Sequence, residues 1–561
     1  MKDTNPHGSA RMSGFLTSVA AILVVSGVGG GPAARADDAD LQPGNLLLSR
    51  VVYDNNPNNV TVGMMLPPGC TPANCVTAVA DGAYPGVFNN APIDGSFGIT
   101  SKIVLDQLTR SGQVISSIEV PNSSQQGVPP TKDHMVGSFS SKSEVALNLS
   151  TDRQFVTFMG YLAAIDTLDV SNSNTIGVVD PTNPVPGTFD RVVAQLDQHG
   201  KFRFTATNAY SGNNGRAAIL NTQTGANLIY TAGNAGNGAN PQPAGVILGA
   251  GLQIMTAETK ALVAQNPPNP PTPVGSFNVT ELGDKADKIG KDTNFRGLTI
   301  FNNVVYTTKG SGGNGVNTVY FIDTSGSNPT TGNPLQCPNG TGLPKPFASL
   351  PSTGIVYDGT QLATKGVFPY NMCVLQGFPT TLAKNDTSFF PFGVWFANAK
   401  TLYVADEGNG TNTFSAGTYT AAAAQTNAGL QKWIFDDGAG TWKLAYVLQA
   451  GLNLGVPYTI AGYPTGNNAA TGLPYPPATD GLRNLTGRVH SDGTVTIWAV
   501  TSTVSGSGDQ GADPNKLVTI TDNLAATSAP AGESFTTVKT AAFAEVLRGV
   551  SFTPGTSDDD D

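Results

Sequence analysis

A short strand motif recurs along this 561-residue chain, and it constrains the fold more than any other feature. In its clearest form an apolar residue and an arginine lead into alternating β-branched and polar residues, the pattern of a half-buried strand. Two segments fit the same phase without the arginine, which gives six units. The six segments are 144–147 (EVAL), 215–219 (GRAAI), 295–299 (FRGLT), 392–396 (FGVWF), 482–486 (LRNLT) and 547–551 (LRGVS).

The strands that follow each segment predict a β-propeller. Each segment is followed by a short turn and a second strand, then by a long Gly/Asn-rich loop, a third strand, a hairpin and a fourth strand. This order of elements is that of a four-stranded antiparallel meander. The last segment has no following strands, whereas the first strands of the chain, 46–53, 103–108 and 113–120, have no such segment before them. The two ends therefore complete one sheet and close a ring.

We predict an all-β, six-bladed propeller closed by N- and C-terminal strands, or a seven-bladed one if residues 310–391 contain an additional sheet. Gly 66, Pro 39 and only 12% charged residues agree with many short strands joined by turns. A pair of β-sandwiches would also show short strands, but it would leave the last strand without partners.

The N-terminus predicts export. Lys2 and Arg11 precede the apolar run 15–28, and 34–36 (ARA) is a small-x-small cleavage pattern. The run is short and broken by glycines, so we expect a signal peptide over 1–36 and no membrane insertion. We therefore expect a single propeller domain over 37–556, an acidic tail over 557–561 and a secreted or periplasmic location.

Net charge and cysteine content indicate which partners, disulfides and metal sites to expect. Without residues 1–36 the chain has 27 bases and 39 acids, a formal charge of −12, which predicts no nucleic-acid binding. Exported cysteines favour disulfides, and the simplest of the three connectivities pairs Cys70 with Cys75 and Cys337 with Cys373. A zinc site is disfavoured because CxxC spacing is missing.

The repeated arginines predict a binding surface. They start the innermost strands, at the same end of the ring as the long loops, so they should converge at one mouth of the axial channel and bind a small anion such as carboxylate, sulfate or phosphate. Glu144 holds the equivalent place in a fifth unit and Phe392 in the sixth. Alternatively, the arginines only join neighbouring blades by bonding to loop carbonyls and to acids such as Asp406. The four arginines are Arg216, Arg296, Arg483 and Arg548.

One stretch carries a family resemblance. Residues 402–410 (LYVADEGNG) resemble the repeat of NHL and SMP-30/gluconolactonase-type propellers, and the match covers these nine residues of one blade. In lactonase-like relatives such turns face a divalent metal, so the resemblance implies Asp406 and Glu407 as ligands of a cation such as calcium. No other blade repeats the motif. As a whole the chain is similar to secreted bacterial β-propellers without an assigned reaction.

Two functions follow from these observations. The first is an exported protein that binds a small anionic molecule at the arginine mouth. The second is an extracellular hydrolase or lactonase acting on a substrate at the same face, possibly metal-assisted, with His134 and Glu144 as candidate catalytic residues. Neither GxSxG, Walker A nor HExxH is present, so no specific enzyme class is indicated.

Overall fold

The computed structural model describes residues 40–56, 58–59, 61, 63–66, 76–77, 80–84, 87–88, 99–125, 135–139, 141, 143–168, 189–207, 210, 214–223, 227–234, 252–257, 275–280, 294–310, 315–323, 371–468, 471–507 and 510–557. The predicted signal peptide, His134, Cys70, Cys75, Cys337 and the tail residues 558–561 lie outside the described residues. Both predicted disulfides therefore involve residues outside them.

Six groups of four consecutive antiparallel strands, which we call blades 1 to 6, build the unit Ala34–Asp561, and they confirm the six-bladed, all-β prediction. In each blade the strand at the ring axis is named first below. Blade 1 contains β31 (Glu545–Phe552), β1 (Leu46–Val52), β6 (Thr100–Leu108) and β7 (Val114–Glu119). Blade 2 contains β9 (Asn148–Leu149), β10 (Phe155–Tyr161), β11 (Arg191–Asp197) and β12 (Phe202–Thr207).

The next two blades follow the same order. Blade 3 contains β13 (Gly215–Asn221), β14 (Leu228–Gly233), β15 (Leu252–Thr256) and β16 (Gly275–Thr280). Blade 4 contains β17 (Phe295–Phe301), β18 (Val304–Lys309), β19 (Thr318–Asp323) and β20 (Asn371–Val374).

Of the last two blades, blade 6 has the two longest strands. Blade 5 contains β21 (Pro391–Asn398), β22 (Thr401–Asp406), β25 (Gly429–Asp436) and β26 (Thr441–Leu448). Blade 6 contains β27 (Ala478–Val489), β28 (Thr494–Val504), β29 (Lys516–Asn523) and β30 (Thr536–Thr540).

Small elements decorate the blades. They are the strand pairs β2 (Met65–Leu66) with β3 (Val76–Thr77), β4 (Ala80–Tyr84) with β5 (Val87–Phe88) and β23 (Phe414–Ser415) with β24 (Thr418–Tyr419), the strand β8 (Gly137–Ser138), the helix α2 (Thr420–Ala423) and the 3₁₀ helices η3 (Ala383–Asn385) and η4 (Gln510–Ala512). Within the described residues, no helix combines the length and apolar character needed to cross a bilayer.

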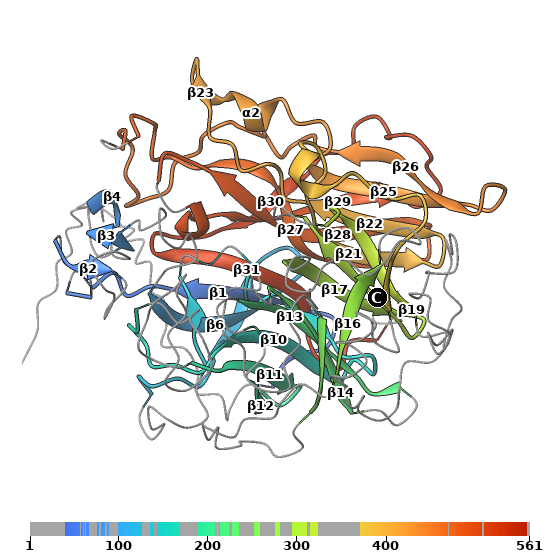
Figure 1. Cartoon of the computed structure of the whole chain (residues 1–561), viewed down its shortest axis with the longest axis horizontal. Coiled ribbons are helices and arrows are strands. Elements are labelled where there is room, and N and C mark those ends of the chain that lie inside the picture. Colours follow the sequence, from blue (N-terminus) through green and yellow to red (C-terminus); the bar gives the residue numbers. More distant parts are fainter. Residues whose placement is uncertain are drawn as a thin grey trace, which may run out of the picture. The chain divides into compact units, whose positions relative to one another are not determined.

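The two ends of the domain share blade 1, as the sequence predicts. β1 lies between β31 and β6 and pairs antiparallel with both, so that Leu46 faces Phe552 on one side and Leu108 on the other. Figure 1 shows the red C-terminal strand β31 beside the blue N-terminal strand β1. Because the chain ends are hydrogen-bonded to each other, neither end of the ring is left as an open sheet edge.

The strand pairing differs in two places from the predicted set of six separate antiparallel meanders. β16 of blade 3 pairs in parallel with β20 of blade 4, with Asn278 opposite Asn371, so these two blades form one eight-stranded sheet. β8 also adds to blade 1 through β6. The sequence could not predict the parallel pair, because about ninety residues separate its two strands.

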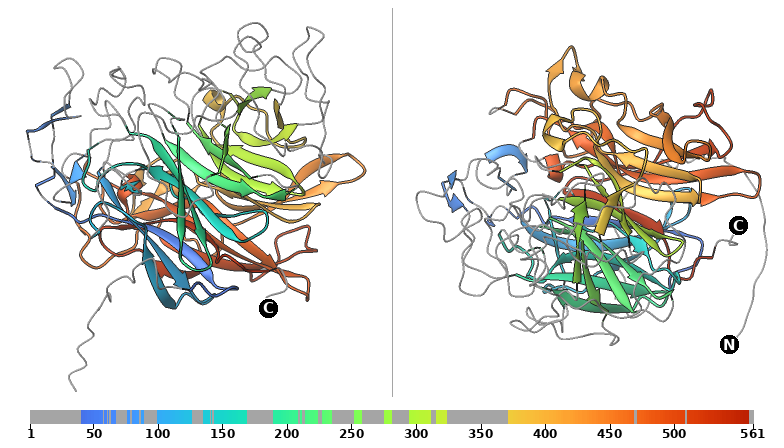
Figure 2. Two further views of the ribbon diagram at one scale, coloured as in Figure 1. Left: turned by 90° about the horizontal axis from the view of Figure 1, so that it is seen from below. Right: turned by 45° about the vertical axis from the view of Figure 1, so that its right-hand side comes forward.

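The inner strands follow one another around the axis in the order β9, β13, β17, β21, β27 and β31, and β31 contacts β9 again. Figure 2 shows the sheets of the domain in two further views, coloured along the sequence as in Figure 1. Neighbouring strands approach closely at glycines. A Cβ on Gly297 would lie 2.0 Å from the Phe392 carbonyl oxygen, and one on Gly393 would lie 2.4 Å from the Arg483 carbonyl oxygen. Glycine is required at both places by contact with the next blade.

Candidate functional site: a buried arginine cluster and a cavity on the propeller axis

In five of the six repeats, the arginine or its equivalent lies at an irregularity of the inner strand. Five of the six inner strands have a β-bulge here, where the inner strand has one residue more than its partner. A bulge breaks the strict alternation of side chains and re-aims one of them. The residues at these bulges are Arg216, Arg296, Phe392, Arg483 and Arg548.

Glu407 joins the arginines of blades 4 and 6. Its carboxylate oxygens lie 3.5 Å from a terminal nitrogen of Arg296 and 3.1 Å from Nε of Arg483. Both guanidinium groups also face the Phe392 ring, with 5.6 and 5.9 Å from the central carbon to the ring centroid. Blade 5, which lacks an arginine at this position, thus supplies an aromatic ring and a carboxylate to its two neighbours.

The other two arginines bond to neighbouring backbone. A terminal nitrogen of Arg216 donates to the Asn294 side chain and, at 3.3 Å, to the Phe295 carbonyl of the next blade. A terminal nitrogen of Arg548 donates to the carbonyls of Phe139 at 2.6 Å and Gly511 at 3.2 Å. These bonds are the blade-joining contacts that the alternative interpretation of the sequence expects.

Glu144 closes the group from blade 2. It is 1% exposed, accepts the Ser138 N–H at 3.0 Å, and precedes Val145, whose φ of 60° bends the backbone before β9. Burial raises the pKa of the Glu144 carboxyl, and hydrogen bonds from Tyr161 and Ser138 and the charge of Arg548 lower it again. We call Glu144, Glu407 and the four arginines the axial cluster.

Electrostatics in the axial cluster are dominated by burial of positive charge. Arg216 is 6% exposed. Burial lowers the pKa of its guanidinium, and Arg296 lowers it further, whereas Glu407 and Glu144 act in the opposite direction. The pKa of Arg296 is also lowered, first by burial, with Glu407 opposing and Arg483 adding to the shift. The arginines therefore repel one another in a site that water does not screen.

Asp480 is a nearby acid that the sequence analysis missed. Burial raises the pKa of its carboxyl to about 7, although the Gly410 N–H and the Gln425 side chain donate to it and Arg483 lies close. It lies in β27, three residues before Arg483, which is the only sequence signal that places it near the cluster.

Asp406 and Glu407 do not fit the metal site that the family resemblance implies. Asp406 is fully buried and accepts the N–H groups of Phe390 and Gly408 and the amide of Gln431, the bonding of a structural turn. Glu407 is bound by two arginines. In the part of the chain that the structure describes, no group of three His, Cys, Asp or Glu side chains could hold a metal ion.

The arginines also lie deeper than the sequence predicts. We expected them to line an open channel mouth, but all four are between 5% and 8% exposed. The structure brings the four arginines and Glu144 together, with Phe392 beside them. His134, the predicted general base, lies outside the described residues.

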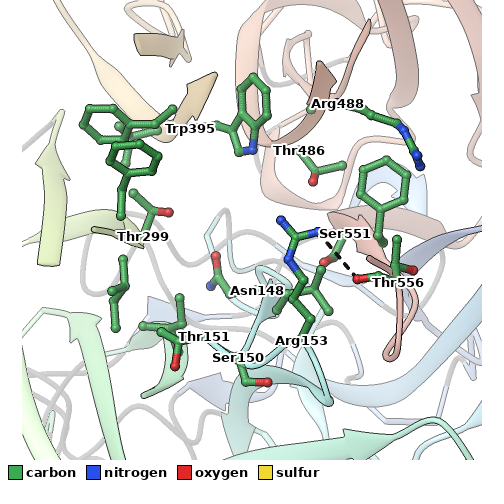
Figure 3. A pocket seen from close by; sticks show the side chains of 18 of the residues that line it. Asn148, Ser150, Thr151, Arg153, Thr299, Trp395, Thr486, Arg488, Ser551 and Thr556 are labelled. Carbon is green, nitrogen blue, oxygen red and sulfur yellow. Dashed lines mark hydrogen bonds between the residues drawn. The ribbon is translucent and has the colours of Figure 1, made fainter. Parts of the chain in front are cut away.

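A cavity of about 420 Å³ lies farther along the same inner strands. Its lining comes from β9, β13, β17, β21, β27 and β31 and from the short turns after β9 and β17. It is thus on the axis, toward the short-turn end of the ring that the sequence analysis left without a role. Figure 3 shows side chains surrounding it, among them Asn148, Thr299, Trp395, Thr486 and Ser551.

Comparisons with known proteins add no function. No protein-family model and no curated protein matches the sequence. Among solved structures, a Niastella koreensis GH74 enzyme aligns with 10% identity and a TM-score of 0.28 over 80% of this chain and 46% of its own. A Pyrococcus horikoshii acylaminoacyl peptidase has 8% identity and a TM-score of 0.25 over 78% and 42%.

A Synechocystis apocarotenoid oxygenase mutant has 10% identity and a TM-score of 0.27 over 81% of this chain and 72% of its own. The chain spans less than half the length of the first two of these structures. The fold is a β-propeller, and no family or activity is assigned.

Proposed function

We propose that this protein is an exported binding protein that holds a small oxyanion in the axial cluster. The observation that carries the proposal is the burial of Arg216 in a group where, among the described residues, four guanidinium groups meet two glutamates. Its Nε has no hydrogen-bond partner in the described protein. An incompletely paired buried charge is costly, so an anion from solution would stabilise the folded protein.

The buried acids near the axial cluster do not offset the excess positive charge of its four arginines. The carboxyls of Glu144, Asp406 and Asp480 all have raised pKa values, chiefly because they are buried. Asp480, with a pKa of about 7, is therefore only partly ionised at neutral pH. A planar guanidinium suits carboxylate, sulfate or phosphate, which can accept two parallel N–H bonds.

A thermal unfolding titration tests the proposal. Sulfate, phosphate and acetate are added to the mature protein at constant ionic strength, and Tm is followed for the wild type, Arg216→Met and the control Arg203→Met. Arg203 lies in the outer strand β12, with its guanidinium 4.8 Å from the Phe155 ring centroid and away from the axis. We expect a saturable rise in Tm for at least one anion, retained in Arg203→Met and lost in Arg216→Met.

Sulfate also stabilises proteins by exclusion from their surface, without a site. That effect grows with concentration without saturating and is equal in all three proteins. A purely non-saturating response, or one that survives in Arg216→Met, would contradict the proposal. The hydrolase or lactonase alternative is not favoured by any described residue, and turnover of ester and lactone panels by the mature protein tests it.

A further inference from the structure

The cavity at the short-turn end has a lining quite different from the axial cluster. Its volume of about 420 Å³ lies in the range of about 300 to 1,000 Å³ that is usual for small-molecule sites. Its lining combines hydroxyl and amide side chains with aromatic and aliphatic ones. Such a mixture suits a ligand that is polar at its edge and apolar on its faces, as a sugar ring is.

Three hydroxyl side chains reach this cavity by the same route. Each lies three positions after an arginine of the axial cluster. In a regular strand the next side chain toward the axis would be two positions after the arginine, and the extra residue of the bulge moves it to three. In the described structure none of the three hydroxyls bonds to another protein group, so all can donate to and accept from a ligand. They are Thr299, Thr486 and Ser551, following Arg296, Arg483 and Arg548.

Trp395 occupies the equivalent place after Phe392. The six-membered part of its indole packs on the backbone of Gly487 in the next blade, where a Cβ would lie 2.7 Å from the ring. The edge that carries the indole N–H faces the cavity (Figure 3). Phe301 and Phe396, stacked with centroids 4.7 Å apart, add an apolar surface. Sugar C–H groups pack on such aromatic surfaces while the N–H donates.

The charge of the lining selects among sugars. Among the described residues of the lining, Arg153 and Arg488 are the charged members, and none is Asp or Glu. A terminal nitrogen of Arg153 lies 3.5 Å from the Thr556 carbonyl at the cavity wall (Figure 3). Two guanidinium groups in a cavity of an acidic protein create a local preference for anions, and a carboxylate is a good partner for them.

We propose that this cavity is a second binding site, separate from the axial cluster, and that it takes an acidic saccharide with one or two rings that bears a uronate carboxylate. Thr299, Thr486 and Ser551 bond to ring hydroxyls, Trp395 positions the ring, and Arg153 and Arg488 pair with the carboxylate. A free uronic acid and the terminal uronate of a polysaccharide share this chemistry.

Isothermal titration calorimetry on the mature protein tests the site with glucuronate, galacturonate and an oligogalacturonate, and with glucose and acetate as controls. We expect a uronate to bind and glucose and acetate to bind more weakly, because each has only part of the required chemistry. Thr299→Val and Thr486→Val keep the side-chain shape and should each weaken uronate binding about 2- to 10-fold. The exposed Thr536→Val in β30 is the matched control and should bind as the wild type does.

Three results would overturn the proposal: no uronate binding by a wild type with normal Tm, equal affinity for acetate and uronate, or equal binding by the Thr299→Val/Thr486→Val double variant and Thr536→Val. Uronate titrations in an Arg216→Met background separate this site from the axial cluster, since the weakening by Thr299→Val should persist there. Loss of binding in Arg216→Met would place the uronate in the axial cluster instead. Stronger binding of the oligomer than of the monomers would identify a polysaccharide end as the source.

Discussion

Arg483 donates its Nε–H to a carboxylate oxygen of Glu407 at 3.1 Å, although the two residues are 76 positions apart and belong to neighbouring blades. Glu407 follows the second strand of blade 5, and Arg483 lies in the inner strand of blade 6. The same carboxylate reaches Arg296 of blade 4. One acid therefore joins three of the six blades at the axis.

Glu407→Gln should destabilise the protein and increase its response to anions. Removing one partner of a buried ion pair leaves the other charge uncompensated, which costs about 3 to 5 kcal/mol. The variant gives Arg296 and Arg483 a stronger need for an external anion, so sulfate or phosphate should raise its Tm by more than that of the wild type. Chemical denaturation with and without phosphate measures both effects. An unchanged stability, or an anion response smaller than in the wild type, would refute this account.

Gly297→Ala should destabilise the ring because blades 4 and 5 touch at this residue. The new methyl group would lie 2.0 Å from the Phe392 carbonyl oxygen, which belongs to backbone and cannot move aside as a side chain can. Overpacking of this kind costs about 1 to 3 kcal/mol or more. Gly466→Ala is the control, since its Cβ would meet no atom within 4 Å. Urea denaturation should give a lower midpoint for Gly297→Ala alone, and equal midpoints would contradict the close approach.

The repeat, the six blades and the shared closing blade could all be predicted from the sequence, because they depend on local strand patterns and on one strand left without partners. The convergence of the arginines follows from the same repeat. Their burial does not, since it depends on segments such as 138–139 and 511, whose carbonyls lie over Arg548. The contacts of Glu407 with Arg296 and Arg483 could not be predicted for a related reason, because a nine-residue motif shows the turn but not the blades on either side.

The cavity was missed because strict alternation along a strand places Thr299 and Thr486 away from the axis. The bulge after Arg296 and Arg483 changes this, and the small residue that follows each arginine, Gly297 or Asn484, is the one sequence signal for it. Asn484 accepts the Val550 N–H of the next blade at 2.6 Å, which glycine at this position could not do.

Asp480 should make stability depend on pH near neutrality. Burial raises the pKa of its carboxyl to about 7 from an ordinary value of 3.8. A raised folded-state pKa means that the folded protein holds the proton more tightly, so this contribution to stability is complete below about pH 4 and is lost as pH rises through 7. Its size is on the order of a few kcal/mol.

Asp480→Asn should flatten this part of the pH profile. Denaturation midpoints are compared with the wild type between pH 4 and 8, and the stability of the variant relative to the wild type should increase toward pH 8. Asp492→Asn is the control, because Asp492 lies in an exposed turn and its pKa is lowered by hydrogen bonds from Thr494. Parallel profiles for the wild type and Asp480→Asn would show that Asp480 does not titrate in this range.

Lys432 and Asp522 should be the ion pair on which stability depends most between blades 5 and 6. Their charged atoms are 3.0 Å apart, both side chains are 0% exposed, and the hydroxyls of Tyr403 and Tyr446 also donate to Asp522. Lys432→Met leaves this carboxylate buried without its cation, so we expect a loss of about 3 to 5 kcal/mol. The double variant with Asp522→Asn should recover part of the loss, because both charges are then gone.

Lys400→Met is the control, since the exposed Lys400–Asp437 pair should contribute about 1 kcal/mol or less. A double-mutant cycle by urea denaturation measures the coupling, and a Lys432→Met variant as stable as Lys400→Met would show that the buried pair does not hold these blades together.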